Sequence, residues 1–129
     1  MFELGLLHEL VAGRHDPLQI GEVPQRICRH FSCGLPFVYL STYTVKKILK
    51  KHGDVTFFDL LILPLLLKHG TYIADRNSCM AIGYQHPETN KDYLAAIKMA
   101  KGNLEFWLST FHRVDAKQLA GVYRRGPRL

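Results

Sequence analysis

The stretch Tyr93-Leu-Ala-Ala-Ile-Lys-Met-Ala-Lys-Gly-Asn-Leu-Glu-Phe-Trp-Leu-Ser-Thr-Phe-His112 decides the fold class of this chain. Side chains alternate along it with the two-residue period of β-strands. The period breaks at Lys101-Gly-Asn103, a combination typical of a tight turn. The stretch therefore predicts two antiparallel strands, 93–100 and 104–112, joined as a hairpin.

Alternation also predicts which side chains share a face of the sheet. Lys98 is the only charge in its otherwise apolar strand. Residues whose numbers sum to about 205 to 207 should be cross-strand neighbours, so we expect Lys98 opposite Leu108 or Ser109 and close to Thr110. In the second strand, one face should carry Leu104, Phe106, Leu108, Thr110 and His112, and the other Glu105, Trp107, Ser109 and Phe111.

The rest of the chain extends this hairpin into an α+β layout. Strands expected at 72–74 and 78–84, with a turn-rich connection at 85–91, complete a four-stranded antiparallel meander. Helical spacing dominates before it, apart from a short extended segment at 37–41. The expected helices are 2–12, 25–31, 45–52 (capped by Thr42 or Thr44 and ended by Gly53), 57–63 (capped by Asp54 or Thr56 and broken at Pro64, with a short turn at 65–68) and a short C-terminal helix, 116–123, capped by Asp115.

Length and composition favour one intracellular domain. The 129 residues are 47% hydrophobic, which suits a single domain, 1–129, with its own core. No apolar run reaches the roughly 20 residues of a membrane span, and the first ten residues lack the basic region of a signal peptide. We therefore expect a cytoplasmic protein, a monomer or small homo-oligomer, with no membrane association.

The three cysteines do not predict a metal site. Cys28 and Cys33 flank His30, but this spacing differs from that of common zinc sites and no second ligand pair is evident. Cys79 stands apart from them. Free, partly buried thiols are the better interpretation, and we expect no metal and no cofactor.

The charge balance points to a polyanionic partner. The formal net charge is +6 and the isoelectric point is about 9.4, which favours nucleic acid or an acidic protein. A solvated helix face is the ordinary explanation of the lysines in the helix 45–52. For RNA, the candidate contacts to flanking phosphates are Lys46, Lys47, Lys50 and Lys51, together with Arg124, Arg125 and Arg128 near the C-terminus.

RNA transesterification requires a base, an acid and groups that stabilise negative charge. The candidate residues for these roles are His52, at the end of the third helix, Lys98, Thr110 and His112. Histidine supplies a base or an acid near neutral pH, and lysine and threonine stabilise the developing charge on the phosphate, with Ser109 as a second hydroxyl. Each also has an ordinary explanation, such as a solvent-facing strand lysine or a histidine at a helix C-terminus. Nothing in the sequence assigns base and acid between the two histidines.

The chain resembles the phage-associated branch of the Barnase–EndoU–colicin–RelE nuclease superfamily. The residues that carry this resemblance are Tyr39-Leu-Ser-Thr-Tyr-Thr-Val-Lys-Lys-Ile-Leu-Lys-Lys-His52, Phe57-Phe-Asp-Leu-Leu61, Leu63-Pro64, Gly83-Tyr84, Lys98 and Leu108-Ser-Thr-Phe-His112. It implies a barnase-like ribonuclease fold and metal-independent cleavage of tRNA or mRNA. It also implies a toxin held by an antitoxin or immunity protein. His52, Lys98 and Thr110 fall on active-site positions, and His112 is an additional one.

Two other functions stay open at this stage. The same fold can serve as a non-catalytic RNA-binding or protein-binding module, because fold alone does not give function. A purely structural interaction domain would use Trp107, Phe111 and Tyr123 as contacts. Arg76 would suit a phosphate-binding arginine, but it falls in a turn of uncertain register.

Overall fold

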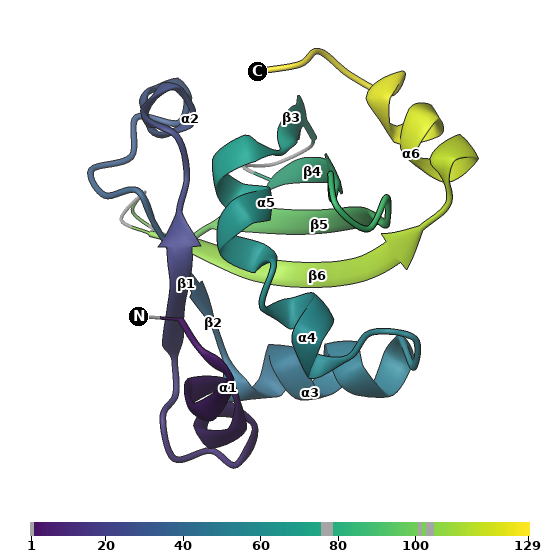
Figure 1. Ribbon diagram of the computed structural model, residues 1–129. Coiled ribbons are helices and arrows are strands. Elements are labelled where there is room, and N and C mark those ends of the chain that lie inside the picture. The colour runs from purple at the N-terminus through teal and green to yellow at the C-terminus, as the bar shows by residue number, and fades with distance from the viewer. Residues whose placement is uncertain (1, 76–78, 101, 103–104) are drawn as a thin grey trace.

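A six-stranded mixed sheet forms the centre of the computed structural model, which describes residues 2–75, 79–100, 102 and 105–129 (Figure 1). The strand order is β1-β2-β6-β5-β4-β3. The strands are β1 (Leu18–Glu22), β2 (Phe37–Leu40), β3 (Thr71–Ala74), β4 (Cys79–Gln85), β5 (Asp92–Met99) and β6 (Phe106–Val114). The α+β class is therefore confirmed.

The expected four-stranded antiparallel sheet is wrong. The meander β3 to β6 is present and antiparallel, but β2 adds to its β6 edge in parallel, with Val38 beside Phe106 and Tyr39 beside Trp107. β1 then pairs with β2 and becomes the other edge. Parallel pairing leaves no turn signal between the partners, because they lie far apart in the chain. β1 was not predicted either, because its buried side chains are only Leu18 and Ile20, too few to show a strand pattern.

The helices follow the expected order with shifted ends. They are α1 (Leu4–Val11), α2 (Gln25–His30), α3 (Thr42–Lys51), α4 (Phe57–Leu60), α5 (Leu63–His69) and α6 (Ala116–Tyr123). Ser41 caps α3, rather than Thr42 or Thr44, because its hydroxyl accepts from the Thr44 amide at 3.1 Å. Pro64 lies in the first turn of α5, where a missing amide hydrogen costs nothing.

Capping boxes start α4 and α6. Thr56 and Asp59 exchange side-chain and backbone hydrogen bonds at α4, as Asp115 and Gln118 do at α6. Asp59 is also buried, and its Oδ1 accepts from the Tyr93 hydroxyl at 2.6 Å. The α4 cap is thereby bonded to β5, whereas the side-chain hydrogen bonds described for Asp115 stay within its own capping box.

One face of the sheet forms the core, and α5 crosses that face in Figure 1. The opposite surface is here called the open face. It carries Ala81, Ala96, Lys98, Trp107, Thr110 and His112. Part of it lies under α6, whose Tyr123 and Leu119 approach Gly83 so closely that a Cβ there would overlap them.

A β-bulge at Ser109 interrupts the hairpin. Ala96 pairs with Thr110 while Ile97 pairs with Leu108, so Ser109 is an extra residue in β6. Its hydroxyl donates to the Ala96 carbonyl at 3.1 Å. The antiparallel hairpin itself is confirmed, although residues 101, 103 and 104 of the expected turn and strand start, and Ser78 of β4, lie outside the described residues.

The bulge overturns the faces expected for β6. Directly opposite residues of an antiparallel pair share a face, so Thr110 and His112 lie on the open face with Trp107, while Phe111 turns into the core. The expected faces are wrong because one extra residue reverses the alternation that follows it. Lys98 pairs with Trp107 rather than with Leu108 or Ser109.

The last residues form an edge of the sheet beside β3. Arg128 bridges Ile73 in antiparallel fashion, and the Leu129 amide donates to the Tyr72 carbonyl at 2.9 Å. The Arg128 guanidinium lies 5.0 Å from the Tyr123 ring centroid. Over the described ranges, no helix is long and apolar enough to cross a membrane.

Candidate active site

Two histidines from distant parts of the chain stack on each other beside the open face. His52 ends α3 and His112 lies in β6, yet their ring centroids are 4.8 Å apart with 17° between the planes. Both side chains are half-buried. The sequence named each histidine as a candidate but did not predict that they touch.

The pairing of β2 with β6 places these rings together. β2 lies beside only the first part of β6, and the chain then turns at Ser41 into α3, which packs along the rest of that strand. Val45 and Ile48 bury the inner side of the helix. The last turn of α3 therefore comes to lie at the level of His112, and His52 projects from its end.

His112 is partly removed from water. Burial lowers its pKa below the ordinary value, and the neighbouring His52 and Lys51 lower it further, against an opposing effect of Asp54. Its Nδ1 is buried without a hydrogen-bond partner among the described residues. A histidine with a lowered pKa is neutral near pH 7 and able to accept a proton.

A small recess of about 40 Å³ opens between α3 and β6, next to the pair. This volume suits one or two water molecules or one small group of a larger ligand. It brings together several predicted side chains from two elements. The lining residues are Lys47, Ile48, Lys51, His52, Ser109 and Thr110.

Lys98 lies on the same face as Thr110. Its side chain is exposed, and it sits two residues along β5 from Ala96, the residue opposite Thr110. Diagonal neighbours across a strand pair lie about 7–8 Å apart, which a lysine side chain spans. Lys98, Thr110 and His112 thus follow one another down the open face.

The other predicted contacts are dispersed. Lys46 and Lys50 are exposed on α3 but do not line the recess, and Arg124 is exposed at the end of α6. Arg125 lines a different pocket. Ser109 is tied to the bulge by its hydrogen bond to β5, and Arg76 lies outside the described residues.

An aromatic pair on the open face is the feature that sequence reasoning missed. Tyr39 and Trp107 lie side by side on β2 and β6, with ring centroids 5.6 Å apart. The Trp107 indole donates to Glu105 at 3.0 Å, and Lys98 is its partner on β5. Only the β2–β6 pairing reveals the contact, so no local pattern could have predicted it.

The cysteine segment has a structural explanation. The Cys28 thiol donates to the Cys33 carbonyl at 2.9 Å, and the Cys33 thiol donates to the Leu35 carbonyl at 3.0 Å. His30 packs edge-on against Phe31. In the part of the chain that the structure describes, no three histidine, cysteine or acidic side chains group together as metal ligands.

The arrangement offers two imidazoles, a hydroxyl and three lysines around one recess and the adjoining sheet surface. Such a set can move protons and stabilise an anion at the same place. A comparison of the chain with protein-family models, curated proteins and solved structures finds no match. Function is therefore inferred from the geometry and from the resemblance described above.

Proposed function

We propose that this protein is a metal-independent endoribonuclease that cleaves RNA by attack of a 2′-hydroxyl on the adjacent phosphate. The contact between His52 and His112 is the observation that carries the proposal, because the reaction needs a base and an acid at one phosphate. The resemblance to the barnase-like superfamily supports it and suggests a cytoplasmic toxin acting on tRNA or mRNA.

His112 is the general base in this proposal. Its lowered pKa keeps the ring neutral at pH 7, and with Nδ1 buried, Nε2 is the nitrogen left to take the 2′-hydroxyl proton. The 2′-oxygen then bonds to phosphorus as the bond from phosphorus to the 5′-oxygen breaks. His52 donates a proton to that leaving oxygen, and a 2′,3′-cyclic phosphate remains.

Negative charge grows on the phosphate oxygens during this step. Lys51, beside His52 in the recess, and Lys98, on the open face, supply the compensating positive charge. Thr110 lies between them and can donate a hydrogen bond to a non-bridging oxygen. The remaining α3 lysines are exposed and positioned to contact flanking phosphates, which would make binding dependent on salt.

The test is cleavage of total RNA by purified protein in the presence of EDTA. We expect products with 2′,3′-cyclic phosphate ends and a loss of about 100-fold or more in rate for His112→Ala and His52→Ala. Lys98→Ala should also reduce the rate. His69→Ala is the matched control, since His69 is an exposed histidine on α5. Equal rates in the His52, His112 and His69 variants would contradict the proposal.

A second function, RNA binding without cleavage, is favoured by the aromatic pair. Tyr39 and Trp107 are half-buried on the open face beside Lys98, a combination on which bases of single-stranded RNA stack. Binding that Trp107→Ala weakens about tenfold, with no cleavage by the wild-type protein, would favour this function.

The toxin proposal has its own test in cells. Expression of the wild-type chain should arrest growth, and His112→Ala should relieve the arrest at equal protein level. An antitoxin or immunity protein, which the resemblance implies, would restore growth by covering the basic surface. Arrest that persists in the His112 variant would contradict a toxic activity based on this site.

A further inference from the structure

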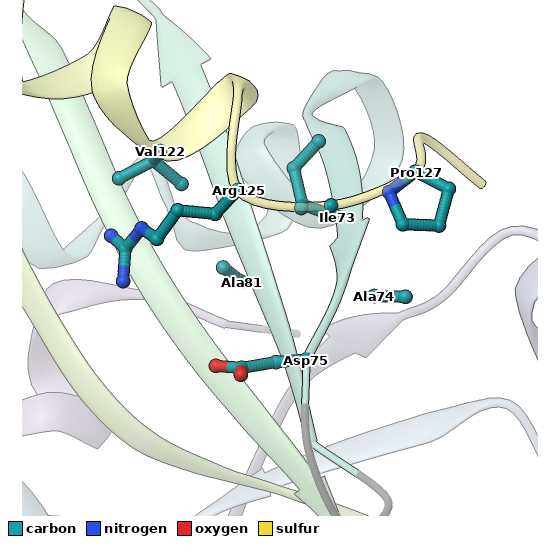
Figure 2. Close-up of a pocket in the computed structure, with 8 residues that line it drawn as sticks. Ile73, Ala74, Asp75, Ala81, Val122, Arg125 and Pro127 are labelled. Atoms are coloured by element: carbon teal, nitrogen blue, oxygen red, sulfur yellow. The ribbon is translucent and has the colours of Figure 1, made fainter.

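A second and larger pocket lies on the open face, between the sheet and the C-terminal segment. Its volume is about 380 Å³, within the range of small-molecule sites. Ala81 is the partly exposed apolar residue of its floor, with Ile73 and Val122 buried behind it, and Arg125 and Asp75 bring opposite charges to its rim. Figure 2 shows the Arg125 side chain extending from the end of α6 over the sheet, with Ala81 and then Asp75 lower in the view.

This pocket and the histidine pair are joined by one row of the sheet. Ile73 pairs with Ala81, Ala81 pairs with Ala96, and Ala96 pairs with Thr110. Paired residues share a face, and neighbouring strands lie about 4.8 Å apart. Ala81 in the pocket is therefore about 10 Å from Thr110 at the recess, two strand spacings away.

The row between the two sites carries small side chains. Ala96 is the residue between Ala81 and Thr110, and both alanines are half-exposed. A methyl group at each position leaves the surface low between the recess and the pocket. A ligand anchored at Thr110 can thus extend across the sheet into the pocket.

We propose that this pocket binds the nucleotide next to the cleaved phosphate, with its base over Ala81, backed by the buried Ile73 and Val122, and its own phosphate at Arg125. The inference rests on the endoribonuclease function proposed above and adds a subsite to it. The separation of about 10 Å, two strand spacings, is the distance that this neighbouring nucleotide would have to span.

The chemistry of the lining agrees with a nucleotide rather than a bare anion. Apolar side chains provide a surface for the flat base, and the guanidinium of Arg125 pairs with phosphate oxygens through parallel hydrogen bonds. The Asp75 carboxylate at the rim would repel a second phosphate. Charge and shape therefore place the base inside and the phosphate at the rim.

The experiment has a binding arm that does not depend on catalysis. AMP, CMP, GMP and UMP are titrated into the His112→Ala protein, and backbone amide shifts are followed by NMR. We expect shifts at Ile73, Ala81 and Val122, and affinity about tenfold weaker after Arg125→Ala. Lys117→Ala, which removes an exposed charge elsewhere on α6, is the matched control and should bind as before.

The cleavage arm uses RNA oligonucleotides with an abasic nucleotide placed at successive positions around the cut. One flanking position should raise KM about tenfold in the wild-type protein. Ala81→Leu should abolish that difference because it fills the position of the base, whereas Arg125→Ala should raise KM for both substrates because it removes the phosphate contact. Arg125 is exposed, so Arg125→Ala should fold normally and tests the pocket even if Ala81→Leu does not fold.

The two proposals fail in distinguishable ways. Cleavage that is unaffected by both pocket variants, with no mononucleotide shifts in the pocket, would overturn the subsite and leave the ribonuclease intact. Mononucleotide binding at Arg125 without cleavage of any RNA would support the subsite as a nucleotide site and overturn the endoribonuclease proposal.

Discussion

The buried carboxylate of Asp59 should be worth about 2 kcal/mol more to the fold than the matching carboxylate of Asp115. Both residues begin a helix with the same capping box. Asp115 is exposed, whereas Asp59 is 5% exposed and also accepts from the Tyr93 hydroxyl at 2.6 Å. Replacing each by alanine therefore removes one cap, and only the Asp59 change also leaves a buried hydroxyl without its partner.

The magnitude follows from these contacts. Loss of a cap costs about 1 kcal/mol, which is the expectation for Asp115→Ala. A hydrogen bond to a charged group contributes about 1.5–3 kcal/mol, so Asp59→Ala should cost about 3 kcal/mol in total. Lys91 approaches Asp59 at 3.9 Å but is half-exposed, so it adds less than about 1 kcal/mol.

Urea denaturation of both variants, with circular dichroism as the signal, measures the difference directly. The two midpoints should differ while the slopes agree, and Tm should fall by roughly 3–4 °C for each kcal/mol. Tyr93→Phe tests the same bond from its other end and should couple with Asp59→Ala in a double-mutant cycle. Free energies of Asp59→Ala and Asp115→Ala that agree within about 0.5 kcal/mol would refute the reasoning.

The pH dependence of the same bond has a definite sign. Burial alone would raise the pKa of Asp59, but the hydrogen bonds from Tyr93 and Thr56, with the charge of Lys91, outweigh it and hold the pKa below its usual value. As the pH falls, the Asp59 carboxylate therefore binds a proton at a higher pH in the unfolded chain than in the folded protein. This stabilisation is present above the pKa that Asp59 has in the unfolded chain, and it is lost as the pH falls through the pKa in the folded protein. The difference in free energy of unfolding between wild type and Asp59→Ala should therefore become smaller in acid.

Three further outcomes are expected. Burial and the neighbouring His52 lower the pKa of His112, so the free energy of unfolding should fall as the pH drops below about 6.5. In urea titrations at several pH values, the free energy of unfolding of His112→Gln should depend less steeply on pH than that of the wild type. Gly83→Ala should lift α6 from β4 and cost about 1–3 kcal/mol with faster proteolysis near the C-terminus, whereas Gly121→Ala, with open space around it, should not. Deletion of Ser109 should remove the bulge but keep Thr110 opposite Ala96 and Phe111 in the core, so cooperative thermal unfolding should be retained; loss of the cooperative transition after this deletion would contradict the bulge.

Local patterns predicted the parts of this fold that depend on neighbouring residues. The period of two located the meander, and the expected hairpin register agreed with the observed pairs from Asp92 with Val114 to Ala96 with Thr110, but not with the partner expected for Lys98. The bulge at Ser109 could not be predicted, since serine is an ordinary strand residue and alternation gives no sign of an extra one. This single residue decided the face of Thr110 and His112.

The site was predictable as a set of residues but not as an arrangement. His52 and His112 were each recognisable by residue type and position, whereas their contact depends on β2 adding to β6 in parallel. That pairing joins segments with no shared turn. The pocket at Arg125 was not predictable for the same reason, because it forms where the C-terminal segment lies beside β3, a contact between segments far apart in the chain.

The pairing of β2 with β6 also determines when the contact between His52 and His112 can form during synthesis of the chain. A nascent chain still attached to the ribosome can form α3 and expose His52 early, but the ring that stacks on it belongs to the last strand of the sheet. Contacts between such distant segments form late in folding. The histidine pair, and with it the activity proposed above, is therefore incomplete until β6 has been synthesised and has paired with β2.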